Sequence, residues 1–260
     1  MKISLTNLRN SRCYATLNFM PLRKVQFYPG EFYHIYNRGN AKQDIFYNDR
    51  DRYRFLQAIY LSNNSDRSIR LVDFERNKGG YTLDDIREIF RDKKITYDPL
   101  VKISADVLMP NHFHFLIEEL QNRGVSRFMQ RFGNSYGRYF NIKYKRPGSL
   151  FQGRFKAVHI KSDDQLKYLL AYINVINPAQ LIEPDIKEKG IKDFQKILEW
   201  VNKYSWSTHF EYMDMRKSPI VDKGLLGEIF PTPEIYYKFI KEILHGKENM
   251  WGVIEGLNID

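Results

Sequence analysis

The stretch Val107–Leu120, VLMPNHFHFLIEEL, carries two of the chain's six histidines, His112 and His114, with one phenylalanine between them. Alternate side chains of a β-strand point to the same face, so the two imidazoles project together while Phe113 points to the opposite face. Two neutral imidazoles at this spacing can hold one divalent metal ion. Two ordinary half-buried histidines would give the same pattern, so the motif alone leaves both interpretations open.

A metal-assisted reaction needs further ligands and a nucleophile, and these must come from elsewhere in the chain. No cluster of carboxylates accompanies the two histidines, so a site that activates water for hydrolysis is not indicated. The surrounding charge is instead basic. Residues 121–162 contain no Asp or Glu, and they contain ten Lys or Arg, as many as the net charge of +10 of the whole chain.

The same segment also holds eight aromatic residues. Basic side chains neutralise phosphates, and aromatic rings can stack on exposed bases, so this composition favours a nucleic acid as partner. A solvated basic face above core aromatics would look similar.

The composition of the 260 residues limits the class of protein. Apolar residues make up 43% of the chain, which allows a folded core. Its one cysteine, Cys13, excludes an internal disulfide and a cysteine-rich metal site, which fits the reducing cytoplasm. No apolar run is long enough to span a membrane, and the N-terminus is too polar for a signal peptide.

Hydrophobic periodicity and turn residues predict which elements carry these groups. We expect a first strand within 30–39, a helix at 52–61, strand segments at 101–106 and 107–118, and a helix at 124–144. We further expect a strand at 150–160, a helix at 165–176 that stops at Asn177-Pro178, and helices at 190–202 and 232–245. Residues 1–19 form an extension expected to be disordered or mis-assigned, 20–212 one domain with an insertion at about 62–98, and 213–260 a C-terminal helical tail.

Basic side chains on two of these elements are candidates for DNA contacts. Within the helix at 124–144, Arg127, Arg131 and Arg138 lie within about 40° of each other on a helical wheel, apart from the aromatic stripe. Arg154 and Lys156 alternate on the strand at 150–160 and are interpreted as phosphate contacts.

Five blocks of the sequence, in this order, resemble the REP-associated tyrosine transposases and the wider single-tyrosine transposases of the IS200/IS605 type. The resemblance covers about residues 20–212. The blocks are Pro29-Gly30-Glu31 with Tyr33-His34-Ile35 and Asn37-Arg38-Gly39, then Leu108–His114, Gly148–Lys156, Leu169–Tyr172 with Asn177-Pro178, and Tyr204–Ser207.

The resemblance implies an HUH endonuclease, an α+β protein whose ferredoxin-like antiparallel sheet is flanked by helices. In this family the two histidines, here His112 and His114, hold Mg²⁺ or Mn²⁺ against the scissile phosphate of single-stranded DNA. A tyrosine from a later helix attacks that phosphate, which leaves a 5′-phosphotyrosine and a free 3′-OH. The implied partner is DNA with hairpin-forming, REP-like repeats, bound by a monomer or a homodimer. Arg38, in the first block, is a further candidate for a DNA contact.

The nucleophile's place in the family is occupied here by Tyr172, and Tyr168, one helical turn earlier, is the alternative. Relatives place Asn-Pro four and five residues after the tyrosine, whereas Asn177 stands five residues after it, so we expect the extra residue to form a bulge. In some relatives the residue four positions after the tyrosine completes the metal site, but here it is Ile176, which cannot ligate. Asn177, Asn174 or a water are the alternatives for the third ligand.

Three hypotheses remain open from the sequence. The first is a metal-dependent endonuclease and strand transferase acting on single-stranded DNA. The second is a hairpin-binding protein derived from a transposase that has lost catalysis, which the altered spacing after Tyr172 favours. The third is a metal hydrolase of a small substrate, against which the acid-free basic segment argues. His34 and Asn37, on or just after the first strand, have either a role near the metal or DNA or a structural one.

Overall fold

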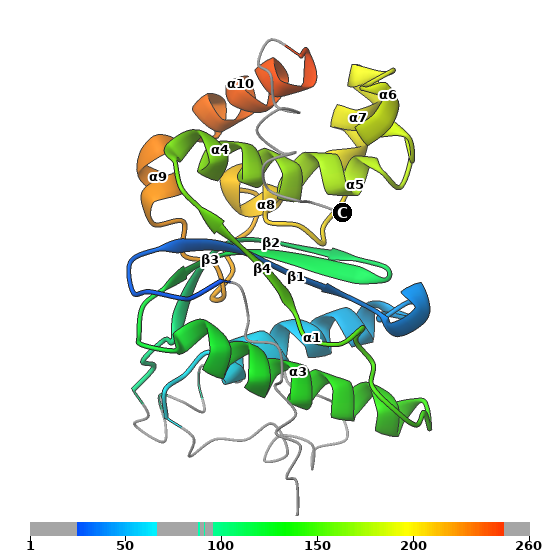
Figure 1. The fold of residues 1–260 in the computed structure, drawn as a ribbon. Helices are drawn as coiled ribbons and strands as arrows, with labels where there is room; N and C mark the ends of the chain where they lie inside the picture. Colours follow the sequence, from blue (N-terminus) through cyan, green and yellow to red (C-terminus); the bar gives the residue numbers. More distant parts are fainter. Residues whose placement is uncertain (1–24, 67–87, 89–90, 92–95, 247–260) are drawn as a thin grey trace, which may run out of the picture.

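The structure is a computed structural model that describes residues 25–66, 88, 91 and 96–246 (Figure 1). The expected N-terminal extension at 1–19 and most of the expected insertion at 62–98 lie outside these residues. None of the helices in the described part of the chain has the length and apolar character of a bilayer span.

A four-stranded antiparallel sheet forms the middle of the molecule, with the strand order β2-β3-β1-β4. Its strands are β1 (Phe32–Arg38), β2 (Val101–Met109), β3 (His112–Glu119) and β4 (Lys156–Ile160). Helix α1 (Asp49–Ser62) connects β1 to β2, and α3 (Gly124–Lys143) connects β3 to β4. This βαββαβ order is ferredoxin-like, so the predicted α+β class is confirmed.

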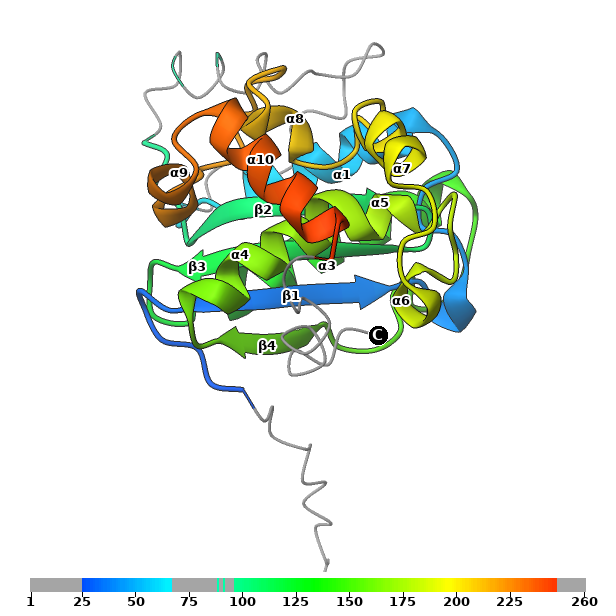
Figure 2. The same cartoon turned by 90° about the horizontal axis from the view of Figure 1, so that it is seen from above.

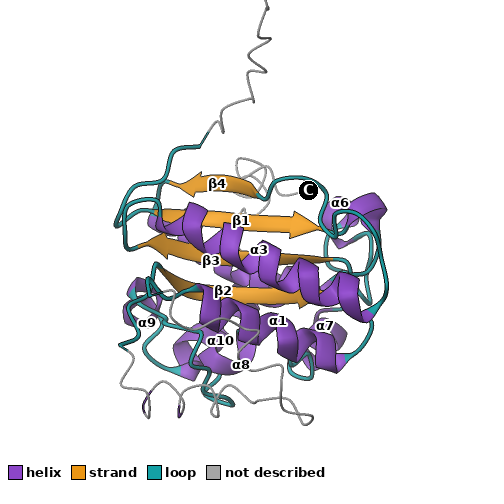
Figure 3. Ribbon diagram, turned by 90° about the horizontal axis from the view of Figure 1, so that it is seen from below, coloured by secondary structure: helices purple, strands orange, loops and turns teal. Residues whose placement is uncertain are grey.

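Helices cover both faces of the sheet, and each face has its own apolar core (Figures 1 and 3). Phe113 and Phe115 of β3 face α1 and α3, and the ring centroid of Phe113 lies 5.2 Å from that of Phe55 and 5.6 Å from that of Phe132. His114 and Leu116, on the alternate positions, face the second helical layer. The strand therefore separates its phenylalanines from its histidines, as the sequence predicts.

The boundaries of two predicted strands are wrong. The segment expected as one strand at 107–118 is divided, because Pro110 and Asn111 form the turn between β2 and β3, and His112 is the first residue of β3. Proline lacks the N–H that a ladder needs, and asparagine favours turns. The strand expected at 150–160 begins only at Lys156, since residues 152–154 form a bend in which Gly153 has a φ of +69°. Arg154 therefore precedes the strand instead of alternating with Lys156 along it.

The helix expected to carry the tyrosine is interrupted by a π-helix. It consists of α4 (Asp163–Ala171), the π-helix η3 (Tyr172–Ile176) and α5 (Asn177–Ala179). The N–H of Asn177 donates to the carbonyl oxygen of Tyr172, five residues earlier, so the expected bulge is observed and takes this form. The helix does not stop at Asn177-Pro178 as predicted, and it continues as α5. A proline breaks a helix because it lacks the N–H for the i to i−4 hydrogen bond, and the widened turn before Pro178 does not use that bond.

The expected helix at 190–202 is α7 (Phe194–Val201), which begins four residues later than predicted. A further short helix that was not predicted, α6 (Ile186–Lys189), precedes it and ends at Gly190, whose φ is +73°. Helices α8 (His209–Tyr212), α9 (Leu225–Ile229) and α10 (Pro233–Leu244) follow. The last of these agrees with the helix predicted at 232–245. Figure 2 shows α10 lying beside α4 on the upper side of the sheet, where Tyr236 and Ile240 are fully buried.

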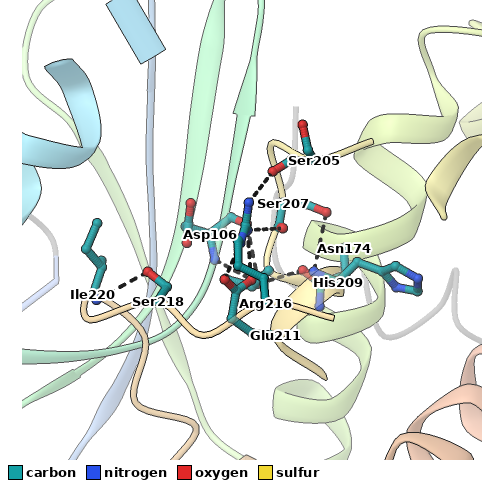
Figure 4. Close-up of polar contacts among 10 residues, drawn as sticks. Asp106, Asn174, Ser205, Ser207, His209, Glu211, Arg216, Ser218 and Ile220 are labelled. Atoms are coloured by element: carbon teal, nitrogen blue, oxygen red, sulfur yellow. Dashed lines mark hydrogen bonds and ion pairs between the residues drawn. The ribbon is translucent and has the colours of Figure 1, made fainter. Parts of the chain in front are cut away.

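The segment after α7 also covers the outer edge of β2. Ser207 forms an isolated bridge with Val107, and Val221 forms one with Ile103. Figure 4 shows Arg216 reaching back along this segment, where its guanidinium binds Glu211 in a bidentate pair and donates to the carbonyl oxygens of Ser205 and Ser207. An exposed edge strand is a site for unwanted pairing, and this segment protects it.

Candidate active site

Four side chains from three elements converge on the upper face of the sheet. His112 and His114 come from β3, His34 from the neighbouring strand β1, and Tyr172 from the first turn of the π-helix. The ring of Tyr172 stands edge-on to both His114 and His34, with centroid distances of 5.6 and 6.3 Å. The two β3 imidazoles are 5.1 Å apart and almost perpendicular. Figure 2 shows α4 crossing above β1 and β3, and the π-helix that begins with Tyr172 continues directly from its end.

Tyr172 is the tyrosine that the structure places against the histidines. Tyr168, the alternative from the sequence, lies one turn earlier on α4 in the same apolar core. Tyr172, His34 and His114 are buried, while His112 is half-buried at the start of its strand. The pairing of Tyr172 with the HxH motif, 58 residues apart in sequence, follows from the packing of α4 on the sheet.

All three histidines are held in the neutral form. Burial lowers the pKa of His112 to about 4 and that of His34 to about 3, and it also lowers the pKa of His114 well below its ordinary value. The nearby cation of Lys187 adds to each of these shifts. Neutral imidazole is the form that binds metal ions, so protonation does not prevent ligation by the two β3 histidines at neutral pH.

Hydrogen bonds fix the orientation of the two β3 imidazoles. Nδ1 of His112 lies 2.6 Å from Oδ1 of Asn111, an acceptor, so this nitrogen carries the proton and Nε2 keeps its lone pair. Nδ1 of His114 lies 2.7 Å from Nε2 of His34. Nε2 of His114 is buried and has no hydrogen-bond partner among the described residues. A buried polar nitrogen of this kind needs a partner, and a metal ion would supply one.

Asn177 is the candidate for the third ligand that best fits this geometry. The π-helix places it one turn from Tyr172, and its side chain lies near enough to His112 to oppose the lowering of the histidine's pKa. Its amide oxygen accepts one hydrogen bond, from Gln180 at 3.2 Å, and so keeps a lone pair. By contrast, Asn174 is used structurally, because its amide donates to Tyr236 at 3.1 Å and accepts from Thr208 at 2.7 Å. Ile176 is fully buried in the apolar core.

The donor set would therefore be two imidazoles and one amide. No group of three or more His, Cys, Asp or Glu side chains with metal-binding geometry occurs within 25–66 and 96–246. A set with few protein ligands leaves coordination positions for phosphate oxygens, as Mg²⁺ sites that act on phosphates do. The residues thus fit a divalent ion that the substrate helps to bind.

Arg38 and Lys156 lie at the same end of the sheet as the histidines. Arg38 is paired with His112 in the β1–β3 register, and its guanidinium donates to the side chain of Gln152. The ammonium of Lys156 lies 5.5 Å from the ring centroid of Tyr36, which packs on His114. Arg154 belongs to the exposed bend beside Arg38. These three predicted DNA contacts are therefore grouped beside the candidate metal site.

The three arginines of α3 are not brought to this site, because α3 covers the opposite face of the sheet (Figure 3). Arg131 donates to the carbonyl oxygens of Asn64 and Ser65, and Arg127 donates to Gln121 at 3.3 Å. Arg138 is exposed on the outer side of the helix. DNA would reach them only by extending around the molecule to the lower layer, so their predicted role stays a prediction.

Lys187 is the site residue that sequence reasoning missed. It lies on α6, and its ammonium is 5.1 Å from the ring centroid of Tyr172. Nothing in the segment IKEKG distinguishes this lysine from the other basic residues of the chain. Only the return of the chain after α5 places it above the tyrosine.

Comparison with known proteins agrees with the family that the motifs resemble. Residues 75–175 match the family model described as "Transposase IS200 like". This is less than half of the chain, but it contains His112, His114 and Tyr172, whereas Asn177 and Lys187 lie beyond it. No curated protein matches the chain.

Two solved structures are similar to the chain at low identity. A structure described as the REP-associated tyrosine transposase bound to a REP hairpin aligns with a TM-score of 0.41 and 15% identity, over 78% of this chain and 94% of that one. The tRNA(His) guanylyltransferase of Saccharomyces cerevisiae aligns with a TM-score of 0.33 and 9% identity, over 72% and 77% of the two chains. The fold is therefore assigned from the strand order and connections of this chain itself.

Proposed function

We propose that this chain, whose residues 75–175 match the IS200-like transposase family, is a metal-dependent endonuclease and strand transferase of single-stranded DNA. The observation that carries the proposal is the position of Tyr172, whose ring is edge-on to that of His114 at 5.6 Å, next to the two β3 imidazoles. A nucleophile and a pair of neutral metal ligands thus share one small region of the sheet.

His112, His114 and the amide oxygen of Asn177 would hold Mg²⁺ or Mn²⁺. Such an ion polarises the phosphoryl oxygens and orients the scissile phosphate for in-line attack. The chain's own contribution is to keep both imidazoles neutral by burial and to hold their rings in place from Asn111 and His34. In metal sites generally, a hydrogen bond to the second nitrogen of a ligating histidine fixes the orientation of its ring.

Tyr172 supplies the attacking oxygen. Its phenolic oxygen bonds to phosphorus, the bond from phosphorus to the 3′ oxygen breaks, and the phenolic proton is lost while the departing 3′ oxygen gains one. The product is a 5′-phosphotyrosine, and attack by a 3′-OH on it restores the phosphodiester and the tyrosine. Because the phosphodiester bond energy is kept in the intermediate, joining requires no nucleotide.

Lys187 favours the ionised form of the nucleophile. An ordinary tyrosine has a pKa of about 10, so the phenolate is rare at neutral pH. A cation 5.1 Å from the ring centroid stabilises the negative charge that develops on the attacking oxygen. Lys187→Met should slow adduct formation roughly tenfold and shift the pH–rate profile to higher pH, whereas Lys189→Met, on the same helix, should not. An unchanged profile would exclude this role.

Arg38, Arg154 and Lys156 would bind phosphates of the strand that enters the site. The resemblance to REP-associated transposases suggests DNA with hairpin-forming repeats as the target. Contacts of this kind release counterions, so affinity should fall steeply with salt.

Covalent capture tests the proposal directly. The full chain is incubated with end-labelled single-stranded oligonucleotides that carry hairpin-forming repeats, with Mg²⁺ or Mn²⁺, and a covalent adduct is sought on denaturing gels. The adduct should form with wild-type protein and with Tyr168→Phe, and it should be lost with Tyr172→Phe and on chelation. Absence of any adduct across such substrates would contradict the proposal.

A binding protein without catalysis is the second candidate, and the extra residue between Tyr172 and Asn177 favours it. The π-helix argues against a loss of catalysis, because its wider turn places Asn177 on the same side of the helix as Tyr172 despite the extra residue. Tight, salt-sensitive hairpin binding without any adduct would select this alternative.

A further inference from the structure

His34 and His114 form a buried pair next to Tyr172. Their relative exposures are 0% and 1%, and Nε2 of His34 lies 2.7 Å from Nδ1 of His114 with the ring planes at 11°. Rings stacked face to face keep their atoms about 3.5 Å apart or more. The short nitrogen–nitrogen distance therefore means that the rings meet edge to edge, in the direction that a ring N–H donates.

The sheet register produces this contact. β1 and β3 are antiparallel neighbours in which Tyr36 faces His114 and His34 faces Leu116. His34 is thus diagonal to His114 on the same face, within reach of a ring side chain. The Tyr36 ring lies 4.7 Å from His34 and 5.4 Å from His114, nearly parallel to both, so it supports the common plane of the pair.

A count of protons leaves two arrangements. A neutral imidazole carries one N–H, so the pair shares one proton across its contact. If His114 donates from Nδ1, its Nε2 is a bare lone pair. If His34 donates from Nε2, then Nε2 of His114 carries a proton and cannot ligate. The outer nitrogens of the pair, Nε2 of His114 and Nδ1 of His34, are both buried and have no hydrogen-bond partner within the part of the chain that the structure describes, so the direction depends on which of them faces the ion.

We propose that His34 is a positioning residue for His114, accepting a hydrogen bond from its Nδ1–H so that the Nε2 lone pair faces the metal ion. The inference rests on the proposed function, because the ion makes the first arrangement the productive one. Ligating histidines commonly donate their second ring N–H to a carboxylate, a carbonyl or water. Here another histidine takes that place. When Nε2 of His34 accepts this hydrogen bond, its Nδ1 carries the proton, so neither ring nitrogen of His34 has a lone pair left for the ion.

Nuclear magnetic resonance of the wild-type protein tests the direction of the hydrogen bond. The full chain labelled with ¹⁵N-histidine is studied without DNA, first metal-free and then with Mg²⁺, or with Zn²⁺ as a diamagnetic substitute for Mn²⁺. A coupling through the hydrogen bond should connect the two nitrogens, and the proton should be assigned to Nδ1 of His114 in the ion-loaded protein. A proton on Nε2 of His34 in that state would overturn the proposal.

Variants test the consequence for metal binding. His34→Phe keeps a ring but removes the acceptor, and it should weaken Mn²⁺ binding by roughly ten- to a hundredfold. His34→Gln keeps a carbonyl acceptor and should remain within a few fold of wild type. His159→Gln is the matched control, because His159 lies on β4 and is hydrogen-bonded to Glu31 at 2.8 Å, on the other face of the sheet.

The readout is Mn²⁺ affinity by electron paramagnetic resonance, together with the number of coordinated nitrogens by electron spin-echo modulation. The nitrogen count should be the same in wild type and His34→Gln. Loss of one nitrogen would show that His34 is a ligand, and unchanged affinity in a folded His34→Phe would show that it has no role; either result overturns the proposal. Because no arm uses DNA, a failure to form the tyrosine adduct would not affect these results.

Discussion

At the scale of single residues, the site depends on side chains that look alike in the sequence but differ in their contacts. Asn174 and Asn177 are both fully buried and both follow Tyr172 within five positions. Asn174 uses its amide to bind Tyr236 and Thr208, whereas the amide oxygen of Asn177 accepts one hydrogen bond, from Gln180 at 3.2 Å, and keeps a lone pair for an ion. Its position beside His112 makes it the better candidate for a ligand.

Substitution of the two asparagines should therefore separate function from stability. Asn177→Ala should weaken Mn²⁺ binding about tenfold or more with a modest change in the free energy of unfolding. Asn174→Ala should instead destabilise the protein by about 1–3 kcal/mol, because it removes the two buried hydrogen bonds to Tyr236 and Thr208, and should leave metal affinity within a few fold. Calorimetric metal titration and urea unfolding distinguish the two. The reverse pattern would assign the third ligand to Asn174.

At the scale of elements, the π-helix η3 determines which side chain would face the proposed metal ion. A regular helix would put Ile176 on the side of Tyr172, but the i to i+5 bond at Asn177 widens the turn by one residue. An apolar residue at the ligand position is thereby kept in the core, and the polar one that follows takes its place.

Deletion of Ile176 tests this reading. The deletion leaves Asn177 four residues after Tyr172, so a regular α-helix would present the amide on the same side. We expect adduct formation and metal affinity to survive, because the π-turn already compensates for the extra residue. Insertion of an alanine after Ile176 is the control and should abolish both. Activity that is lost on deletion and kept on insertion would contradict the role of the π-helix.

The order of elements and the division of faces on β3 could be predicted from the sequence, because period-2 and period-3.6 patterns report burial directly. The alternation of Phe113 and His114 is an example. Contacts between residues that come together only when the chain folds back on itself could not be predicted. Lys187 reaches Tyr172 through a short helix after α5, and no local pattern encodes that contact. The bend at Gly153, which places Arg154 outside β4, could not be predicted either. The positive φ of Gly153 causes it, but the residues around it look like one continuous strand in the sequence.

At the scale of the whole molecule, the segment after α7 joins the tyrosine layer to the edge of the sheet. Arg216 binds Glu211 and two carbonyl oxygens at this junction (Figure 4), and Glu211 is only 4% exposed. The same junction contains Asp106 of β2 and Thr208, whose hydroxyl also donates to Asn174. The segment after α7 thus contacts the π-helix through the hydrogen bond from Thr208 to Asn174.

Removal of Arg216 should be strongly destabilising. Arg216→Met leaves the carboxylate of Glu211 buried and without its bidentate partner, which should cost about 3–5 kcal/mol of unfolding free energy. The double variant Arg216→Met with Glu211→Gln removes the uncompensated charge and should recover part of that loss. Urea unfolding of the single and double variants measures both. Equal stability of wild type and Arg216→Met would show that the pair contributes little.

The same junction should give the protein a pH-dependent stability through Asp106. Burial, with a smaller contribution from nearby Glu211, raises the pKa of Asp106 to about 7, above the value of the unfolded chain. The folded state therefore holds a proton that the unfolded state releases, so this group's contribution is present at acid pH and is lost as the pH rises towards 7. Asp106→Asn keeps the shape without the ionisation. Relative to wild type, it should be stabilising at pH 8, and the difference in unfolding free energy should shrink steadily towards pH 4. Urea unfolding at several pH values measures that difference, and one that does not change with pH would exclude Asp106 as the titrating group.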